Sequence, residues 1–229
     1  MSDAQPMLKA GSLPGLRALV FDLDGTLVDS APGIGTSLKT AFNAAGREIP
    51  TCDLSSLVGP PINIIARRLE PSLTADEVTV IEKEFRADYD AKGWRKAIPF
   101  DGVVEGLLRL GRTGIRLFVV TNKPRIPTEK MLENLGLNAV FEKVLTLDTR
   151  IPKYANKTEM LAELIRDQGI EAAFSAMVGD TNEDQEAARG NGVRFIYVTY
   201  GYGRVLEADI QVEKFQAIEN MLCQGDTER

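Results

Sequence analysis

The sequence contains no histidine among its 229 residues. Histidine is the only side chain whose ordinary pKa lies near neutrality, and it is also a common metal ligand. Its absence excludes Ser-His-Asp and Cys-His catalysis and imidazole metal sites. Any acid–base catalysis must therefore come from Asp, Glu, Lys or Tyr.

Cysteine and long apolar segments are also scarce. Cys52 and Cys223, the two cysteines of the chain, are too few and too far apart for a disulfide framework or a metal knuckle, and they indicate a reducing compartment. No run of eighteen apolar residues could span a bilayer, and the first fifteen residues lack the apolar segment of a signal peptide. We therefore expect a cytoplasmic protein with no membrane partner.

The chain has no block of Lys or Arg, and its formal net charge is −6. Nucleic-acid-binding surfaces carry clustered positive charge, so no nucleic-acid partner is expected. Hydrophobic residues make up 44% of the chain. This content and the length suit one large domain, or a core with a smaller insert.

One stretch near the N-terminus has the clearest pattern. The apolar run 18–21 is followed by Asp22 and Asp24 on alternate residues and then by Gly25, which is typical of a buried parallel strand that ends in a loop. Alternate residues of an extended chain point the same way, so the two carboxylates would share one site. A bound cation such as Mg²⁺, or separate protonation roles, would relieve their repulsion. Alternatively, they are solvated acids before a glycine turn.

The chain after residue 99 alternates between two patterns. Short apolar runs occur near 115–120, 144–146, 174–178 and 194–199, with helical spacing between them. This alternation predicts an α/β fold, a Rossmann-like doubly wound parallel sheet with helices on both faces. Residues 31–98 show helical spacing only, with Ser30 as a possible N-cap and Thr74-x-x-Glu77 as a capping box, and they predict a small inserted α-helical cap domain. The predicted division is a core of 16–30 and 99–229, a cap of 31–98 and a flexible leader of 1–15.

Polar residues follow three of the predicted strands. They are Asp22 and Asp24, Thr121 and Asn122, and Asp180 and Asp184. Ligands of doubly wound sheets bind outside the carboxyl ends of the strands, so these side chains predict one binding site. Thr121 and Asn122 could bind an oxyanion or simply cap a helix, and the acids near 180 could simply be the acidic start of a helix.

Four segments resemble, in the right order, the motifs of the haloacid dehalogenase superfamily. They are DLDGTLVDS at 22–30, VTNK at 120–123, a lysine before a helix, and VGDTNED at 178–184. The resemblance covers residues 16 to about 203. The helical insert is similar to the small cap of the phosphoglycolate phosphatase-like branch.

The resemblance implies a role for each matching residue. Asp22 would be the nucleophile that forms an aspartyl phosphate, and Asp24 the general acid and later the base. Mg²⁺ would be held by the Asp22 carboxylate, the Asp24 backbone carbonyl and Asp180, with Asp184 in support. Thr121 and Asn122 would bind phosphoryl oxygens. Dehalogenases of the superfamily lack the second acid, so Asp24 favours phosphoryl transfer.

The third motif departs from many relatives, which have Lys-Pro there. Lys157, directly before a predicted helix, matches best and would neutralise the aspartate and phosphate charges, whereas Lys153 is the alternative. In the insert, Gly59-Pro60-Pro61 resembles a segment of related caps. Arg67 or Arg68 could bind the substrate or be solvated, and Trp94 could lie at the junction of cap and core or against the substrate.

The sequence thus predicts a Mg²⁺-dependent phosphatase that hydrolyses a small phosphorylated metabolite, with phosphoglycolate the first candidate. A phosphosugar mutase of the β-phosphoglucomutase kind shares all four motifs and is the nearest alternative. A non-enzymatic phosphoaspartyl switch is a further alternative, although Asp24 and the insert argue against it. Residues 200–203 (YGYG) predict a flexible turn without a functional role.

Overall fold

The computed structural model describes residues 15–51, 53–208 and 210–223. The predicted leader, residues 1–15, lies outside the described residues apart from Gly15. The strands are β1 (Ala18–Phe21), β2 (Val28–Asp29), β3 (Ile98–Pro99), β4 (Arg116–Thr121), β5 (Lys143–Thr146), β6 (Ser175–Gly179), β7 (Arg194–Val198) and β8 (Ile210–Val212). The α-helices are α1 (Ala31–Ala44), α2 (Ile62–Leu69), α3 (Ala75–Ala91), α4 (Val103–Leu110), α5 (Arg125–Asn134), α6 (Lys157–Gln168), α7 (Asn182–Gly190) and α8 (Phe215–Cys223). Short 3₁₀ helices are η1 (Leu54–Leu57), η2 (Gly93–Lys96) and η3 (Ala172–Phe174).

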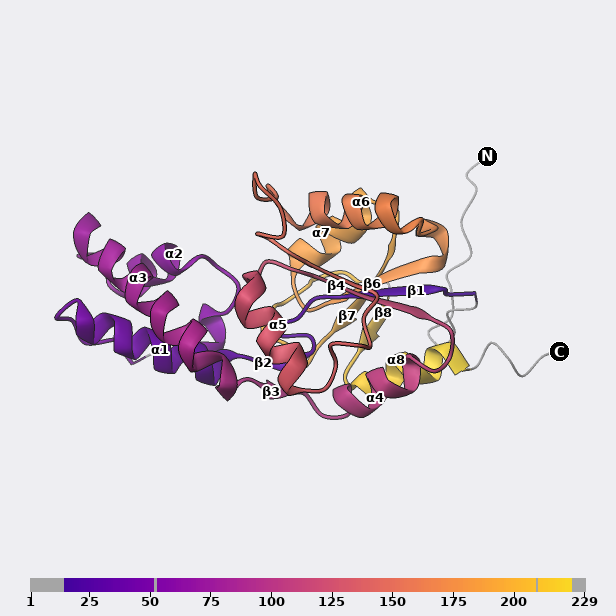
Figure 1. The fold of residues 1–229 in the computed structure, drawn as a ribbon, viewed down its shortest axis with the longest axis horizontal. Coiled ribbons are helices and arrows are strands. Elements are labelled where there is room, and N and C mark those ends of the chain that lie inside the picture. The colour runs from indigo at the N-terminus through magenta and orange to yellow at the C-terminus, as the bar shows by residue number, and fades with distance from the viewer. Residues whose placement is uncertain (1–14, 52, 209, 224–229) are drawn as a thin grey trace.

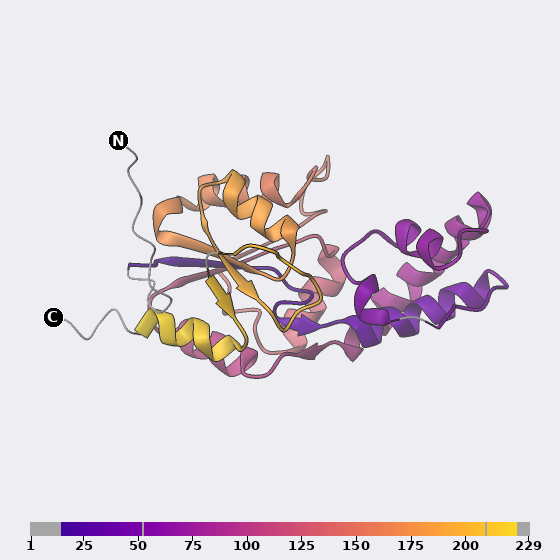
Figure 2. The same ribbon diagram turned by 180° about the vertical axis from the view of Figure 1, so that it is seen from behind.

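Six parallel strands form the central sheet, in the order β5-β4-β1-β6-β7-β8. Helices α6 and α7 cover one face, and α4 and α8 cover the other (Figures 1 and 2). The predicted α/β fold with a doubly wound parallel sheet is confirmed. The strand order changes direction at β1, between β4 and β6, and such a point is where sheets of this kind bind ligands.

Strand β1 is apolar throughout because it is buried on both faces. Ala18 and Val20 pack in the cluster that includes α6 and α7, whereas Leu19 and Phe21 pack in the cluster that includes α4 and α8. Successive side chains of a strand point to opposite faces, so a continuous apolar run is needed here.

Helices α1, α2 and α3, called the cap helices below, lie beyond one end of the sheet (Figure 1). Helix α3 begins with the predicted capping box, in which Thr74 and Glu77 each bond to the other's backbone N–H. Ser30 precedes α1 as predicted, but its hydroxyl is buried without a hydrogen bond, and Asp29 Oδ1 accepts the N–H of Ala31 instead. The hydroxyl therefore does not cap the helix.

The two connections to the cap helices run side by side. Strands β2 and β3 form an antiparallel pair in which Val28 faces Pro99 and Asp29 faces Ile98. This pair was not predicted, because two-residue strands carry too little periodicity to be recognised. It fixes the place where the chain leaves the sheet and returns.

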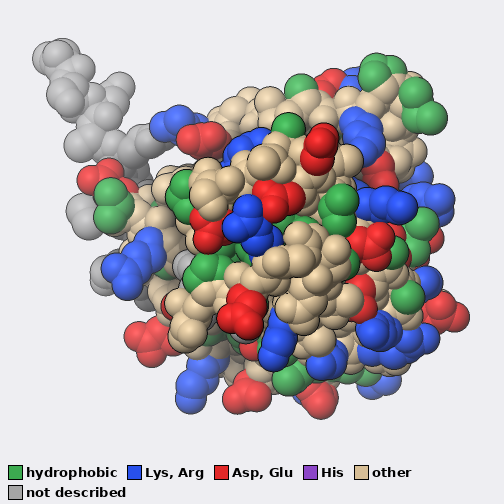
Figure 3. Space-filling view, turned by 90° about the vertical axis from the view of Figure 1, so that its left-hand side faces the viewer, with side chains coloured by type: hydrophobic (Ala, Val, Ile, Leu, Met, Phe, Trp, Pro, Cys, Tyr) green, Lys and Arg blue, Asp and Glu red, His purple; other side chains and the backbone are tan. Residues whose placement is uncertain are grey.

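The last described residues, which the sequence assigned to the core domain, form a strand and a helix that were not predicted. Strand β8 extends the sheet at its edge beside β7, and α8 buries Phe215 and Ile218 against α4. Among the described residues, no helix is long and apolar enough to cross a membrane. Seen from the end that carries the cap helices (Figure 3), positive and negative side chains are interspersed over the described residues.

Candidate functional site

The carboxyl ends of β1, β4 and β6 open into one cavity. Asp22 follows β1, Thr121 ends β4 and Asp180 follows β6, and all three line a cavity of about 650 Å³ between the sheet and the cap helices. Parallel strands end at the same edge, so residues up to 158 positions apart in sequence meet there.

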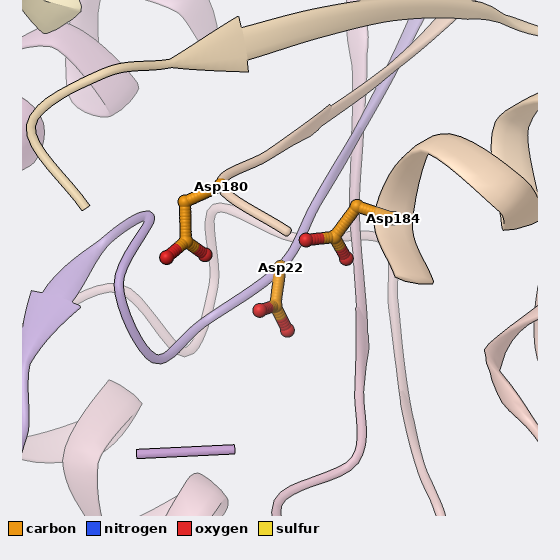
Figure 4. A group of neighbouring side chains, drawn as sticks. All are labelled: Asp22, Asp180 and Asp184. Atoms are coloured by element: carbon orange, nitrogen blue, oxygen red, sulfur yellow. The ribbon is translucent and has the colours of Figure 1, made fainter. Parts of the chain in front are cut away.

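Three buried carboxylates, those of Asp22, Asp180 and Asp184, gather at this edge (Figure 4). Each offers an oxygen, and these oxygens lie within 4.8 Å of one another. Asp184 reaches the group from the first turn of α7, where its Oδ2 also accepts hydrogen bonds from the backbone N–H and hydroxyl of Thr181.

One lysine balances this group. Lys157, the first residue of α6, is buried, and its Nζ lies 2.6 Å from Asp184 Oδ1 and 3.0 Å from Asp22 Oδ1. Lys153 is exposed at the rim of the cavity. Of the two candidate lysines, Lys157 is the one that contacts the buried acids.

Three acids and one lysine leave the group with an excess of negative charge. Burial raises the pKa of Asp22 to about 8 and, although Lys157 opposes this, the neighbouring Asp184 and Asp180 add to it. Burial also disfavours the charged form of Lys157, but the attraction of Asp184 and Asp22 outweighs it and raises the pKa of the ammonium. Lys157 thus stays charged, whereas burial and the neighbouring acids favour the protonated form of Asp22.

The second acid of the first motif pairs with a different lysine. Lys123 Nζ lies 3.0 and 3.1 Å from the two carboxylate oxygens of Asp24, and it donates a hydrogen bond of 2.8 Å to the hydroxyl of Tyr89. Tyr89 belongs to α3, so this contact joins a cap helix to the sheet. Tyr89 was not predicted, because a single tyrosine carries no pattern, and Lys123, although it ends the VTNK motif, was given no role.

Thr121 and Asn122 both line the cavity. Thr121 Oγ1 accepts the N–H of Lys123, while the Asn122 amide nitrogen donates to Glu183 at 2.8 Å. Neither side chain caps a helix, since α5 begins after Pro124. A phosphoryl oxygen bound by Asn122 would have to replace Glu183 as the acceptor.

The acids at the strand ends fit a hard divalent cation. Asp22 Oδ1 is buried and makes no hydrogen bond, although Lys157 is near, and the donors are oxygen atoms only. Asp180 Oδ1 can still bind a cation, because it accepts one long hydrogen bond of 3.3 Å from Thr26. Both oxygens of Asp184 are engaged by Lys157 and Thr181, which suits a supporting role.

Comparison with known proteins agrees with this geometry. The family model described as haloacid dehalogenase-like hydrolase matches residues 19–198. The chain belongs to this family. A curated phosphoglycolate phosphatase of Agrobacterium fabrum is 35% identical over 208 residues, covering 87% of this chain and 89% of that protein. The predicted resemblance is therefore confirmed.

Two further relatives of this chain differ in their described activity. The tyrosine-protein kinase PtkA of Mycobacterium tuberculosis is 35% identical over 189 residues, which cover 82% of this chain but only 64% of that protein. A solved structure described as a predicted phosphatase from Clostridium acetobutylicum has a TM-score of 0.76 and 29% identity, covering 91% of this chain and 99% of that one.

In this chain, residues 200–203 are not the loose turn that the sequence predicted. The backbone N–H groups of Tyr202 and Gly203 donate to Asp180 Oδ2 at 2.8 and 3.0 Å. Gly201 packs so closely that a Cβ there would lie 2.3 Å from the carbonyl oxygen of Gly25. Small residues at this point therefore let the loop approach and orient Asp180.

The Tyr202 side chain connects the same loop to the start of the cap helices. Its hydroxyl accepts the N–H groups of Ser30 at 2.7 Å and Ala31 at 3.1 Å and donates to Asp29 Oδ1 at 2.5 Å. These partners lie more than 170 positions away in the sequence. No local pattern could have revealed them.

We expect Tyr202→Phe to destabilise the fold by about 1–3 kcal/mol, because it leaves the buried N–H of Ser30 without its acceptor. Tyr200→Phe is the matched control, since its hydroxyl makes one hydrogen bond, to the carbonyl of Thr26. Urea denaturation monitored by circular dichroism measures both. Equal losses in the two variants would contradict the anchoring role of Tyr202.

The raised pKa of Asp22 predicts a pH dependence of stability. Since the value of about 8 exceeds the ordinary 3.8, the folded state binds the extra proton between these values. Without metal, stability should therefore fall as pH rises from about 5 to 8. Mg²⁺ competes with this proton, so its stabilising effect should be larger at pH 8 than at pH 6.

Melting temperatures measured with chelator and with Mg²⁺, at pH 6 and at pH 8, test this expectation. The Asp22→Asn variant is the control, because it removes the titrating carboxyl. It should reduce both the fall in stability with pH and the pH dependence of the Mg²⁺ effect. A stabilisation by Mg²⁺ that is equal at pH 6 and pH 8 in the unaltered protein would contradict the assignment.

The arginines suggested by the sequence are not where the substrate would bind. Arg67 and Arg68 do not line the cavity, and Arg67 donates to the carbonyl of Leu73. Arg86, on α3, lines it instead. Trp94 is buried, and Lys130 of α5 lies 6.0 Å from its ring centroid, which places Trp94 at the contact between the cap helices and α5.

Proposed function

We propose that the chain is a Mg²⁺-dependent phosphatase that hydrolyses a small phosphomonoester through an aspartyl phosphate. The observation that carries the proposal is the convergence of Asp22, Asp24, Lys157 and Asp180 on one cavity. The phosphoglycolate phosphatase relative supports the reaction class, because it matches this chain over 89% of its own length.

In the first step, a carboxylate oxygen of Asp22 attacks phosphorus and the bond to the ester oxygen breaks. Protonated Asp24 gives its proton to that oxygen, so the product leaves as a neutral alcohol. Lys157 neutralises charge on the nucleophile and the phosphoryl group and is held in place by Asp184. Thr121 and Asn122 would bind phosphoryl oxygens.

In the second step, water attacks the phosphorus of the aspartyl phosphate. Asp24, now ionised, takes the proton of the water, and the bond between phosphorus and the Asp22 oxygen breaks to release phosphate. Lys123, 3.0 Å from Asp24 Oδ2, would hold this carboxylate in place for both steps. Each turnover thus restores both aspartates.

The metal site would be formed by Asp22, Asp180 and the Asp24 backbone carbonyl, with Asp184 in support. A bound Mg²⁺ would neutralise charge on the phosphoryl group and orient it toward Asp22. The hydrogen bonds from Tyr202 and Gly203 hold the Asp180 carboxylate toward the cavity for this purpose.

The test is release of inorganic phosphate from a panel of phosphorylated metabolites, with Mg²⁺ and with chelator. We expect metal-dependent release from a few members, and a phosphorylated protein detectable by mass spectrometry after rapid acid quenching. Interconversion of sugar phosphates without net release would instead support the mutase. A stable phosphoprotein without turnover would support a phosphoaspartyl switch.

A second candidate is transfer of the phosphoryl group to a protein hydroxyl, and the similarity to tyrosine-protein kinase PtkA favours it. Transfer would use the same aspartyl phosphate, with a tyrosyl hydroxyl in place of water. Incubation with ATP labelled at the γ-phosphate tests this candidate. Label that appears on tyrosine, rather than as free phosphate, would support it.

A further inference from the structure

The side of the cavity formed by the cap helices is apolar. Val58 and Pro61 from the loop before α2, Ile62 and Ile65 from α2, and Phe85 from α3 line it. Val58 and Ile62 are partly buried and Pro61 is exposed, so part of their apolar surface is available to a ligand. This wall lines the same cavity as Asp22 and Asp24, so the leaving group of an ester bound at those aspartates can reach it.

Helix α2 has two arginines, yet it does not present them to the cavity. Ile62 and Ile65, one turn apart, line the cavity, whereas Arg67 and Arg68 do not. The amphipathic pattern of this helix thus places apolar surface, rather than positive charge, where the leaving group would lie.

The cations that do line the cavity are poorly placed for an anionic leaving group. Among the described lining residues these are Lys123, Lys157, Lys153 and Arg86. Lys123 and Lys157 are already paired with aspartates, and Lys153 is exposed in the segment before α6, outside the cap helices. Arg86 lies on α3 between Glu82 and Asp90, which also line the cavity at spacings of four residues and offset its charge.

The cavity is also large for a two-carbon leaving group. Its volume of about 650 Å³ falls within the range that holds drug-sized ligands. Glycolate would leave the apolar wall in contact with water, and its carboxylate would share the cavity with Glu82 and Asp90. A larger apolar group would instead cover that wall.

We propose that the substrate's leaving group is an apolar alcohol, carrying an aromatic ring or a branched alkyl chain, that binds against Val58, Pro61 and Ile62. This proposal rests on the proposed phosphatase activity and specifies its substrate class. It departs from phosphoglycolate, the first candidate of the sequence analysis, because the wall lacks an unopposed cation for a carboxylate.

The experiment compares kcat/KM for benzyl phosphate and 2-phosphoglycolate with Mg²⁺. Both release a primary alcohol, so a difference reports binding of the leaving group more than its acidity. We expect benzyl phosphate to be preferred by about tenfold or more, the scale on which apolar pockets discriminate. A preference for phosphoglycolate would overturn the proposal while leaving the phosphatase activity established.

A charge introduced into the wall provides the second measurement. Ile62→Arg should lower kcat/KM for benzyl phosphate by about tenfold and raise it for phosphoglycolate. Ile64→Arg is the matched control, because Ile64 lies on the same helix, is 41% exposed and does not line the cavity. Ile64→Arg should leave the preference unchanged. An unchanged preference in Ile62→Arg would overturn the proposal.

Binding of non-hydrolysable analogues separates this proposal from the proposed function. Calorimetry would compare 2-phenylethylphosphonate with 3-phosphonopropionate, which replace the ester oxygens of the two substrates by methylene. Tighter binding of the phenyl compound without hydrolysis of any ester would support the apolar subsite and contradict the phosphatase. Tighter binding of the carboxylate compound, or binding of neither, would overturn the subsite.

Discussion

Asp22→Asn should abolish phosphate release, with a loss of at least about 10⁴-fold in kcat. An amide oxygen is a much weaker nucleophile than a carboxylate, and the covalent intermediate cannot form by the same step. No phosphorylated protein should appear after acid quenching. Steady-state phosphate release and intact mass measure the two effects.

Loss of folding would not explain this result. The variant removes one charge from a buried group with excess negative charge, so without metal it should melt at the same temperature or higher. Asp148→Asn is the matched control. Asp148 also lines the cavity, but its Oδ1 accepts the N–H of Arg125 at the start of α5, a bond that asparagine can keep. Substantial turnover by Asp22→Asn would show that another group is the nucleophile.

The sequence predicted the sheet because burial leaves a strong local signal. Strands β1, β4, β6 and β7 are buried nearly throughout, so each is a short apolar run bounded by polar or turn residues. Strand β8 covers an edge and has only three residues, one of them exposed. Its pattern is too short to distinguish a strand from a loop.

The acids of the site were predictable for a related reason. Asp22 and Asp180 each follow a buried strand directly, and the parallel arrangement then brings their strand ends together. Asp184 follows Asp180 by one helical turn, so its place near Asp180 is also set locally. The sequence thus showed where these residues lie along the chain, and the parallel arrangement of the strands predicted that they meet.

Contacts between segments that are distant in the sequence produce no local sequence pattern. Tyr202 contacts residues that lie more than 170 positions earlier, and Lys123 meets Tyr89 only because α3 packs above the sheet edge. Glycines at 201 and 203 indicate a turn when considered locally, yet here they permit close packing against Asp180. The gathering of the acids at the strand ends was therefore easier to predict than the residues that hold them in place.

Lys157→Met should cause a combined loss of stability and activity. Removing Lys157 leaves Asp22 and Asp184 buried beside Asp180 without a balancing cation, and breaking a buried pair in this way costs roughly 3–5 kcal/mol. Phosphate release should fall by about 100-fold to 1,000-fold, as for loss of one charge-stabilising group. Urea denaturation and steady-state kinetics measure the two losses.

Lys153→Met is the matched control, because it removes the same charge from an exposed position four residues earlier. A surface substitution of this kind should change stability by less than about 0.5 kcal/mol. Added Mg²⁺ should restore part of the stability of Lys157→Met, since a divalent cation would balance the same carboxylates, and it should leave Lys153→Met little changed. If Lys153→Met instead caused the larger loss of activity, Lys153 would be the lysine that neutralises the phosphoryl group, and Lys157 would serve only to balance the buried acids.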